Sequence, residues 1–260
     1  MPRSHGFTLV EMILTMIVSS ILLLGIASFV ELGMSGYADT VARQKIQIQA
    51  QFVLEKLSRE LRSSVPNSIA TNIEPDGRDC VSFYPTRHAG FYALNPREKQ
   101  LTFLVNNPPV EADYDELSAI INPSRQADFS SSTGQALVLT EQSLQINACD
   151  DEPDNLACNT VTINNFSPSL LKGRSISNRI YLFNQKVSYC LNTATGMMTR
   201  KVGEGSNSVG VNVADSLHSG SFTYEAPTLQ RGGLVRIALT FSQRDEESHY
   251  QKDVQVLNAP

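Results

Sequence analysis

The residues that could carry out chemistry lie at the start of the chain, where Gly6 and Phe7 precede the acidic side chain Glu11. From Phe7 to Val30 the chain runs 24 residues with one charge, Glu11. A helix of this length crosses a hydrocarbon core of about 30 Å. A carboxylate near the start of a membrane span costs up to about 3 kcal/mol, so we expect Glu11 to have a partner or a function.

The spacing between Phe7 and Glu11 suits an ion pair between neighbouring chains. The resemblance of this junction to the signal of type IV pilins and type II secretion pseudopilins implies a cut between Gly6 and Phe7. The cut would leave a positive amino group on Phe7, with Glu11 about 6 Å further along the same helix. The amine of one subunit could then meet Glu11 of another inside a helix bundle of low dielectric, where a paired charge sets the register. We therefore predict that Glu11 guides assembly. The alternatives are that Glu11 reaches the membrane interface or pairs with its own amino terminus.

Gly6, Phe7 and Glu11 before a long apolar helix resemble the class III signal of type IV pilins and type II secretion pseudopilins. The resemblance implies that a prepilin peptidase cuts after Gly6, that Phe7 becomes the N-methylated terminus, and that Glu11 is the acid of the mature chain. It also implies partners: prepilin peptidase, other major and minor pilins, and the inner-membrane assembly platform.

Two other interpretations apply to the apolar segment. A secretory signal peptide has an apolar run of about 7 to 15 residues before its cut site, whereas the nearest such site here, Gly25 to Ala27, lies inside a longer run. An uncleaved anchor would share the expected orientation, because Arg3 and His5 place positive charge on the cytoplasmic side. We therefore expect one pass through the inner membrane, a periplasmic carboxy-terminal domain, and the pilus as the location after assembly.

Length and charge bound the remaining possibilities. The chain has 260 residues, so we predict a leader at 1–6, an amino-terminal helix at 7–62 with a transmembrane segment at 7–30, and a globular domain at 63–260. The net charge of −5 argues against nucleic acid as a partner.

The helix is predicted to continue beyond the membrane. No glycine or proline occurs from Tyr37 to Val65, although Gly33 and Gly36 could loosen the helix just before. Glu55 with Arg59, and Lys56 with Glu60, have the i,i+4 spacing of surface ion pairs. An apolar stripe at helical spacing is expected to pack under a sheet; it consists of Ile46, Ala50, Val53, Leu54, Leu57 and Leu61.

After Pro66 the apolar pattern alternates, which predicts an α+β fold with a mainly antiparallel sheet. In the segment 234–241, Val235, Ile237 and Leu239 should face the core while Arg236 and Thr240 face away. The predicted strands are 80–84, 101–105, 136–140, 160–163, 180–183, 187–191, 197–202, 234–241 and 254–257. A polar turn at 192–196 predicts a hairpin, and the segments 106–128 and 130–135 are predicted to be loops or insertions.

The order YCLNTATGMMTRKV, GGLVRIALTF and VQVLNAP resembles J-type minor pseudopilins and their relatives in pilus systems, the MSHA pilus system in particular. The predicted function is a minor pilin-like structural subunit, assembled into a type IV pilus or priming one, near its tip. The alternatives are a type II secretion minor pseudopilin and a periplasmic binding or sensing module on a plain membrane anchor.

Four cysteines lie beyond the span, where an oxidising periplasm favours disulfides. Four cysteines allow three connectivities. We predict Cys149 with Cys158 as the first pair, since they enclose a short loop, and then Cys80 with Cys190. The alternative is that one pair stays reduced and buried.

No residue pattern predicts catalysis or a cofactor. The chain lacks a G-x-S-x-G or P-loop motif, and His88, His218 and His249 lack the H-E-x-x-H arrangement of zinc sites. One weak candidate for a calcium site remains, because hard cations prefer several oxygen ligands. It consists of Asp150, Asp151, Glu152 and Asp154, and a solvated loop is the preferred interpretation of this cluster.

Overall fold

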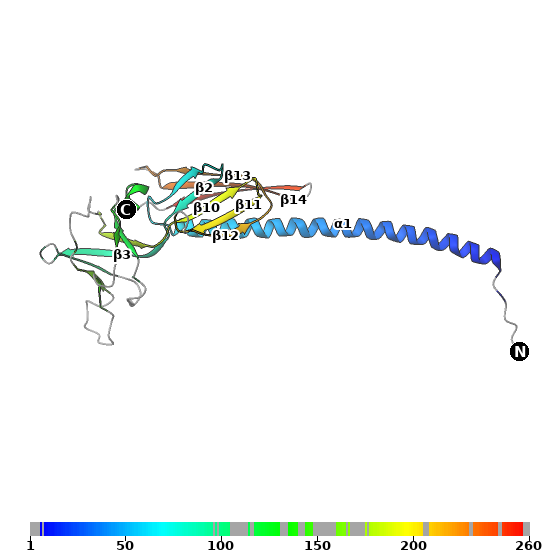
Figure 1. Ribbon diagram of the computed structural model, residues 1–260, viewed down its shortest axis with the longest axis horizontal. Helices are drawn as coiled ribbons and strands as arrows, with labels where there is room; N and C mark the ends of the chain where they lie inside the picture. The colour runs from blue at the N-terminus through cyan, green and yellow to red at the C-terminus, as the bar shows by residue number, and fades with distance from the viewer. Residues whose placement is uncertain are drawn as a thin grey trace. The chain divides into compact units, whose positions relative to one another are not determined.

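The computed structural model describes residues 6, 8–95, 97, 99–104, 114, 117–130, 135–139, 144–147, 160–164, 166, 175, 177–204, 208–228, 231–243 and 246–256. The described part contains one long helix, α1, and antiparallel sheets, so the predicted α+β class is confirmed (Figure 1). The chain forms two compact units, Met1–Ile48 and Gln49–Pro260.

The helix α1 spans Leu9–Arg62, and its end agrees with the prediction. It runs without a break through Gly33 and Gly36, where the sequence had suggested loosening. Its last turn closes through hydrogen bonds from the backbone N–H of Ser63 to the carbonyl of Arg59 and from Ser64 to Leu61. Pro66 follows, which cannot continue the helical ladder.

The apolar stripe of α1 is buried as predicted, from Ile46 and Ala50 to Leu61. In the second unit, two ion pairs join α1 to strands: Glu60 with Arg200 and Glu55 with Lys252. The predicted surface pairs also form, with 3.5 Å between Glu55 and Arg59 and 3.4 Å between Lys56 and Glu60. Within this unit, the helix therefore buries its apolar side chains, and the two ion pairs tie it to the strands.

A five-stranded antiparallel sheet contains the strands that follow α1 and those that come late in the chain. Its order is β1 (Ala70–Ile73), β2 (Asp79–Phe83), β10 (Val187–Asn192), β11 (Met197–Val202) and β12 (Val209–Ala214). The predicted hairpin joins β10 to β11, with Asn192 opposite Met197 and Gly196 at a positive φ of 65°. Glycine adopts this backbone conformation without steric cost, which explains its place in the turn.

A three-stranded sheet consists of β13 (Leu217–Glu225), β14 (Gly233–Gln243) and β15 (Glu246–Val256). The predicted faces of β14 are confirmed, because Val235, Ile237 and Leu239 are buried while Arg236 is exposed. Gly220 on β13 allows close packing, since an added Cβ would lie 2.9 Å from Leu191 of β10.

Between β2 and β10 the chain makes a long insertion that forms a seven-stranded sheet. Its order is β6 (Leu137–Val138), β5 (Ser118–Ile121), β9 (Arg179–Phe183), β3 (Thr86–Asn95), β4 (Gln100–Leu104), β8 (Thr160–Ile163) and β7 (Leu144–Asn147). This sheet has its own core, with Phe103, Val161 and Leu182 fully buried. The second unit thus contains the five-stranded sheet, the three-stranded sheet and the seven-stranded sheet of the insertion.

The structure of this unit differs from the sequence predictions at several strands, β1, β7, β12 and β13 among them. The segment 106–128 was predicted as a loop or an insertion; it belongs to the insertion, but it is not only loop, because it contains β5 and the start of a 3-10 helix at Gln126–Phe129. The strand β3 was not predicted, because its side chains alternate between half-buried and exposed with little apolar contrast. The last strand was predicted from Val254, whereas β15 begins at Glu246, because pairing with β14 along its whole length holds a strand of polar sequence.

Candidate processing and assembly site

The first turn of α1 is held by a side-chain cap. The backbone N–H of Met12 donates to the carbonyl of Thr8 at 3.2 Å, and that of Glu11 donates to Thr8 Oγ1 at 3.3 Å. Thr8 is thus the N-cap and Glu11 the third helical residue, the spacing of a capping box. The pattern Thr-x-x-Glu stands in the sequence, so this role of Thr8 could have been predicted from it.

Gly6 is exposed and non-helical, and Thr8 delimits the helix two residues later. Phe7, the predicted methylated residue, lies outside the described residues. Glu11 is exposed in the first turn, where the helix dipole favours a negative charge. Its carboxylate has no ion-pair partner among the described residues, so it is available to a group from outside the chain.

The apolar part of α1 is long and apolar enough to cross a membrane. All residues from Leu9 to Val30 are exposed in the isolated chain. The hydroxyls within this part donate to carbonyls of their own helix: Thr15 to Met12, Ser19 to Thr15, and Ser20 to Met16. A hydrocarbon core offers no water to such groups, and this arrangement satisfies them inside the helix.

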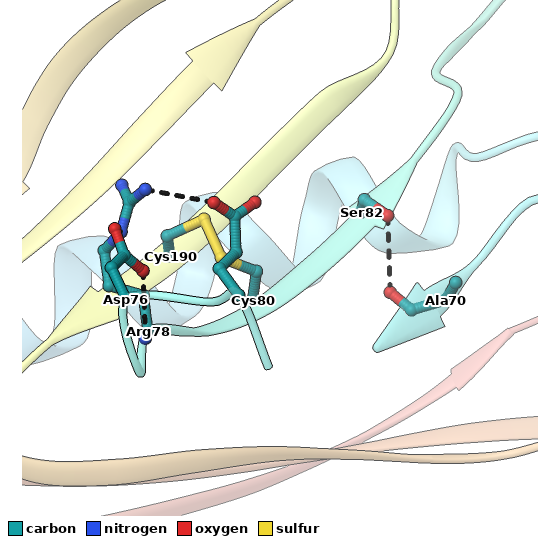
Figure 2. The surroundings of a disulfide bond; sticks show 7 residues. Ala70, Asp76, Arg78, Cys80, Ser82 and Cys190 are labelled. Atoms are coloured by element: carbon teal, nitrogen blue, oxygen red, sulfur yellow. Dashed lines mark hydrogen bonds and ion pairs between the residues drawn. A yellow bond between two sulfur atoms is a disulfide. The ribbon is translucent and has the colours of Figure 1, made fainter. Parts of the chain in front are cut away.

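A disulfide joins Cys80 on β2 to Cys190 on β10, directly opposite each other in the sheet (Figure 2). The two Cα atoms are 4.1 Å apart, and the residues are 1% and 0% exposed. The insertion leaves the five-stranded sheet after β2 and returns to it before β10, so this bond crosses the base of the insertion. The chain also contains Cys149 and Cys158, the other predicted pair, which lie outside the described residues.

Charged side chains of the β1–β2 turn lie beside the disulfide (Figure 2). Arg78 lies 2.6 Å from Asp76 and 3.0 Å from Glu74, which ties the β1–β2 turn together. The carboxylate of Glu74 lies close to the two sulfur atoms, within 4.8 Å. These sulfurs are bonded to each other and cannot act as thiolate ligands, so the group does not hold a metal in this form.

The remaining sequence candidates do not gather at one site. Asp150, Asp151, Glu152 and Asp154, the weak calcium candidate, lie outside the described residues. His218 lies 3.6 Å from Glu247, and His249 bonds to Thr240, so these two histidines take part in strand-to-strand contacts.

Comparison with known proteins identifies the amino-terminal segment. Residues 1–27 match the family model described as the prokaryotic N-terminal methylation motif. This match supports a type IV pilin-like protein that prepilin peptidase processes, and it fits a membrane-anchored chain with a carboxy-terminal soluble domain. No curated protein and no solved structure matches the chain.

Proposed function

We propose that this chain is a minor pilin, cut between Gly6 and Phe7, N-methylated on Phe7, and assembled through Glu11 into a type IV pilus. The match to the amino-terminal methylation motif carries the proposal, because Gly6 and Glu11 lie within the matched residues and Glu11 is in the first turn of a helix able to span a membrane. The other pilins of the filament would cover this helix, and the assembly platform in the inner membrane would extract it.

A second feature of α1 supports assembly over simple anchoring. Beyond the predicted span, Met34, Tyr37, Val41 and Ile48 are all exposed, and their spacing of three, four and seven residues places them on one face. Ile48 follows the buried Ile46 by two residues, so this face points away from the buried stripe. A plain anchor needs no apolar face outside the bilayer, whereas a helix that packs against other helices does.

The size of the soluble domain supports a position at the tip. The insertion between β2 and β10 adds a seven-stranded sheet to the two other sheets. A bulky domain of this kind is difficult to stack repeatedly along a shaft, and a tip position removes the subunit above it. The loose resemblance of the carboxy-terminal strands to the MSHA pilus biogenesis protein MshO favours an MSHA-type system.

The amino-terminal sequence and intact mass of the membrane protein test the proposal. With prepilin peptidase present, we expect a chain that begins at N-methylated Phe7; without the peptidase, Met1 or its immediate neighbour should remain. A chain that keeps its leader in both strains would overturn the proposal in favour of a plain anchor. Detection of the subunit in sheared pili rather than in a secretion pseudopilus separates the two filament systems.

A further inference from the structure

The strand β12 forms one edge of the five-stranded sheet, and its six residues, Val209–Ala214, carry no charge. Gly210, Val211 and Asn212 are exposed, with Val211 at 60%. Among the described residues, no strand pairs with the outer side of β12. An edge of this kind exposes unpaired N–H and C=O groups to any extended chain that comes close.

The edge strand β15 of the three-stranded sheet is protected. β15 carries Glu246, Glu247, Lys252 and Asp253 among its eleven residues. Lys252 is held by Glu55 of α1 at 3.2 Å. Charged edge strands resist pairing with foreign strands. The contrast with β12 suggests that β12 is left open for a partner.

The positive charge of Lys201 on β11 indicates that the partner has a negatively charged group. Lys201 is directly opposite Gly210, so the two residues share a face of the sheet. A Cβ built on Gly210 would lie 3.5 Å from Lys201 Cγ, which shows that the lysine side chain lies beside the bare glycine. Lys201 is half-buried and has no ion-pair partner among the described residues.

We propose that β12 binds an extended segment of another protein by strand addition, and that this segment places a carboxylate opposite Gly210. Neighbouring strands lie about 4.8 Å apart, so the backbone of the incoming residue is roughly 9.6 Å from the backbone of Lys201. Gly210 lies between them and has no side chain, so the side chains of a glutamate and of Lys201 can meet above it. The alternate residues of the segment are apolar and pack beside Val211. Main-chain hydrogen bonds supply affinity, and the carboxylate supplies selectivity.

The test uses the full-length protein in detergent micelles and three synthetic peptides. The first alternates threonine and valine around a central glutamate (TVTVEVTVT), the second has lysine at the centre, and the third is the glutamate peptide with all of its backbone nitrogens methylated. We expect the glutamate peptide to bind at least about threefold more tightly than the lysine peptide. The methylated peptide should not bind, because it cannot pair with an edge. Hydrogen exchange should show protection of amides within 209–214.

Charge reversal decides whether Lys201 is responsible. In Lys201→Glu the order of the two peptides should invert, whereas Arg87→Glu, an equal change on the exposed face of β3, should leave it unaltered. Binding with the same order in Lys201→Glu, protection outside 209–214, or no binding of either peptide would overturn the proposal. The test does not involve processing at Gly6, so its result is separate from that of the proposed function.

Discussion

Arg200 on β11 donates from Nε to both carboxylate oxygens of Glu60 on α1, at 3.2 Å and 3.1 Å. Both side chains are mostly buried, at 26% and 21% exposed. The Arg200 guanidinium also lies 5.9 Å from the centre of the Tyr189 ring on β10, at the distance of a cation–π contact. One ion pair therefore ties the helix to two strands of the five-stranded sheet.

Replacing Glu60 by alanine should destabilise the soluble domain. The change leaves the Arg200 charge partly buried without its partner, which costs about 2 kcal/mol in the free energy of unfolding. Urea unfolding of the detergent-solubilised chain, followed by tyrosine circular dichroism, measures the effect. Arg59→Ala removes a charge that is 79% exposed and should change the free energy of unfolding by less than about 0.5 kcal/mol. Equal effects of the two variants would contradict this role for Glu60.

The carboxylate of Asp128 should make the stability of the insertion depend on pH. Asp128 is 2% exposed and accepts hydrogen bonds from the N–H and Oγ of Ser124 at 2.9 Å and 2.8 Å, and from the N–H of Arg125 at 3.1 Å. Burial alone would raise the pKa of this carboxyl, but the bonds from Ser124 and Arg125 outweigh burial and hold the pKa below its ordinary value.

The sign of the pH effect follows from this lowered pKa. The folded-state pKa lies below the unfolded value of about 3.9, so the stabilisation is complete at neutral pH and is lost as the pH falls below about 4 and through the folded-state pKa. Asp128→Asn should therefore cost about 2 kcal/mol at pH 7 and clearly less at pH 3, as measured by urea unfolding. Asp253→Asn, at an exposed position on β15, is the control and should cost little at either pH. A cost that is the same at both pH values would exclude the proposed linkage.

Reduction of the disulfide should require unfolding. Both sulfurs belong to buried residues, so dithiothreitol should release no thiol from Cys80 or Cys190 under native conditions, and should release both in urea. The loop closed by the bond spans 110 residues in sequence, and a chain-entropy estimate gives a loss of about 4.8 kcal/mol for the double variant Cys80→Ala with Cys190→Ala. Labelling of the free thiols followed by peptide mass mapping measures the first effect, and urea unfolding measures the second. Rapid reduction of this bond in the folded chain would contradict the prediction.

Gly90 should tolerate no side chain. An added Cβ would overlap the carbonyl oxygen of Leu104, a backbone atom that cannot move aside without disturbing β4. Gly90→Ala should destabilise the insertion sheet by more than about 2 kcal/mol. In contrast, Gly36→Ala meets open space on α1 and should be neutral or stabilising, since alanine favours a helix by about 1 kcal/mol over glycine. Thermal unfolding of both variants against the parent chain tests the difference.

The sequence predicted the parts of the fold in which local pattern and burial agree. The stripe of α1 and the alternation of β14 could be predicted because each buried face repeats at the period of its element. The strand β3 could not, because its first part pairs with β9 and its second part with β4 through backbone hydrogen bonds, while most of its side chains remain half exposed. Long-range pairing, rather than local preference, makes this segment a strand.

The candidate sites also divide into features that depend on local sequence and features that depend on long-range strand pairing. Gly6 and Glu11 could be proposed as candidates because their spacing is short and fixed, and the Thr8 cap follows from the same few residues. The open edge at β12 could not be predicted, because it depends on which strands become neighbours. The pairing of Lys201 with Gly210 joins residues nine positions apart, across the segment that links β11 to β12. A sequence pattern does not reveal which edge remains unpaired.

Glu11→Gln should separate processing from assembly. The substitution keeps the length of the side chain and leaves Gly6, Phe7 and the Thr8 cap unchanged, so the peptidase should still cut. It removes the negative charge that would pair with the amine of a neighbouring subunit in a low-dielectric bundle. We therefore expect a chain of processed mass that remains in the membrane, with its amount in sheared filaments reduced at least about tenfold.

Glu31→Gln is the matched control, because Glu31 is the next acidic residue of α1 and lies outside the matched motif. This variant should be cut and should enter filaments at the parent level. If Glu11→Gln also assembles at the parent level, Glu11 does not guide assembly and acts through the helix dipole or the membrane interface. If Glu11→Gln is not cut, the carboxylate serves recognition by the peptidase, and its loss from filaments follows from the retained leader. Quantifying processed chain and filament chain in the same cells distinguishes these outcomes, because an assembly defect alone raises the ratio of processed membrane chain to filament chain.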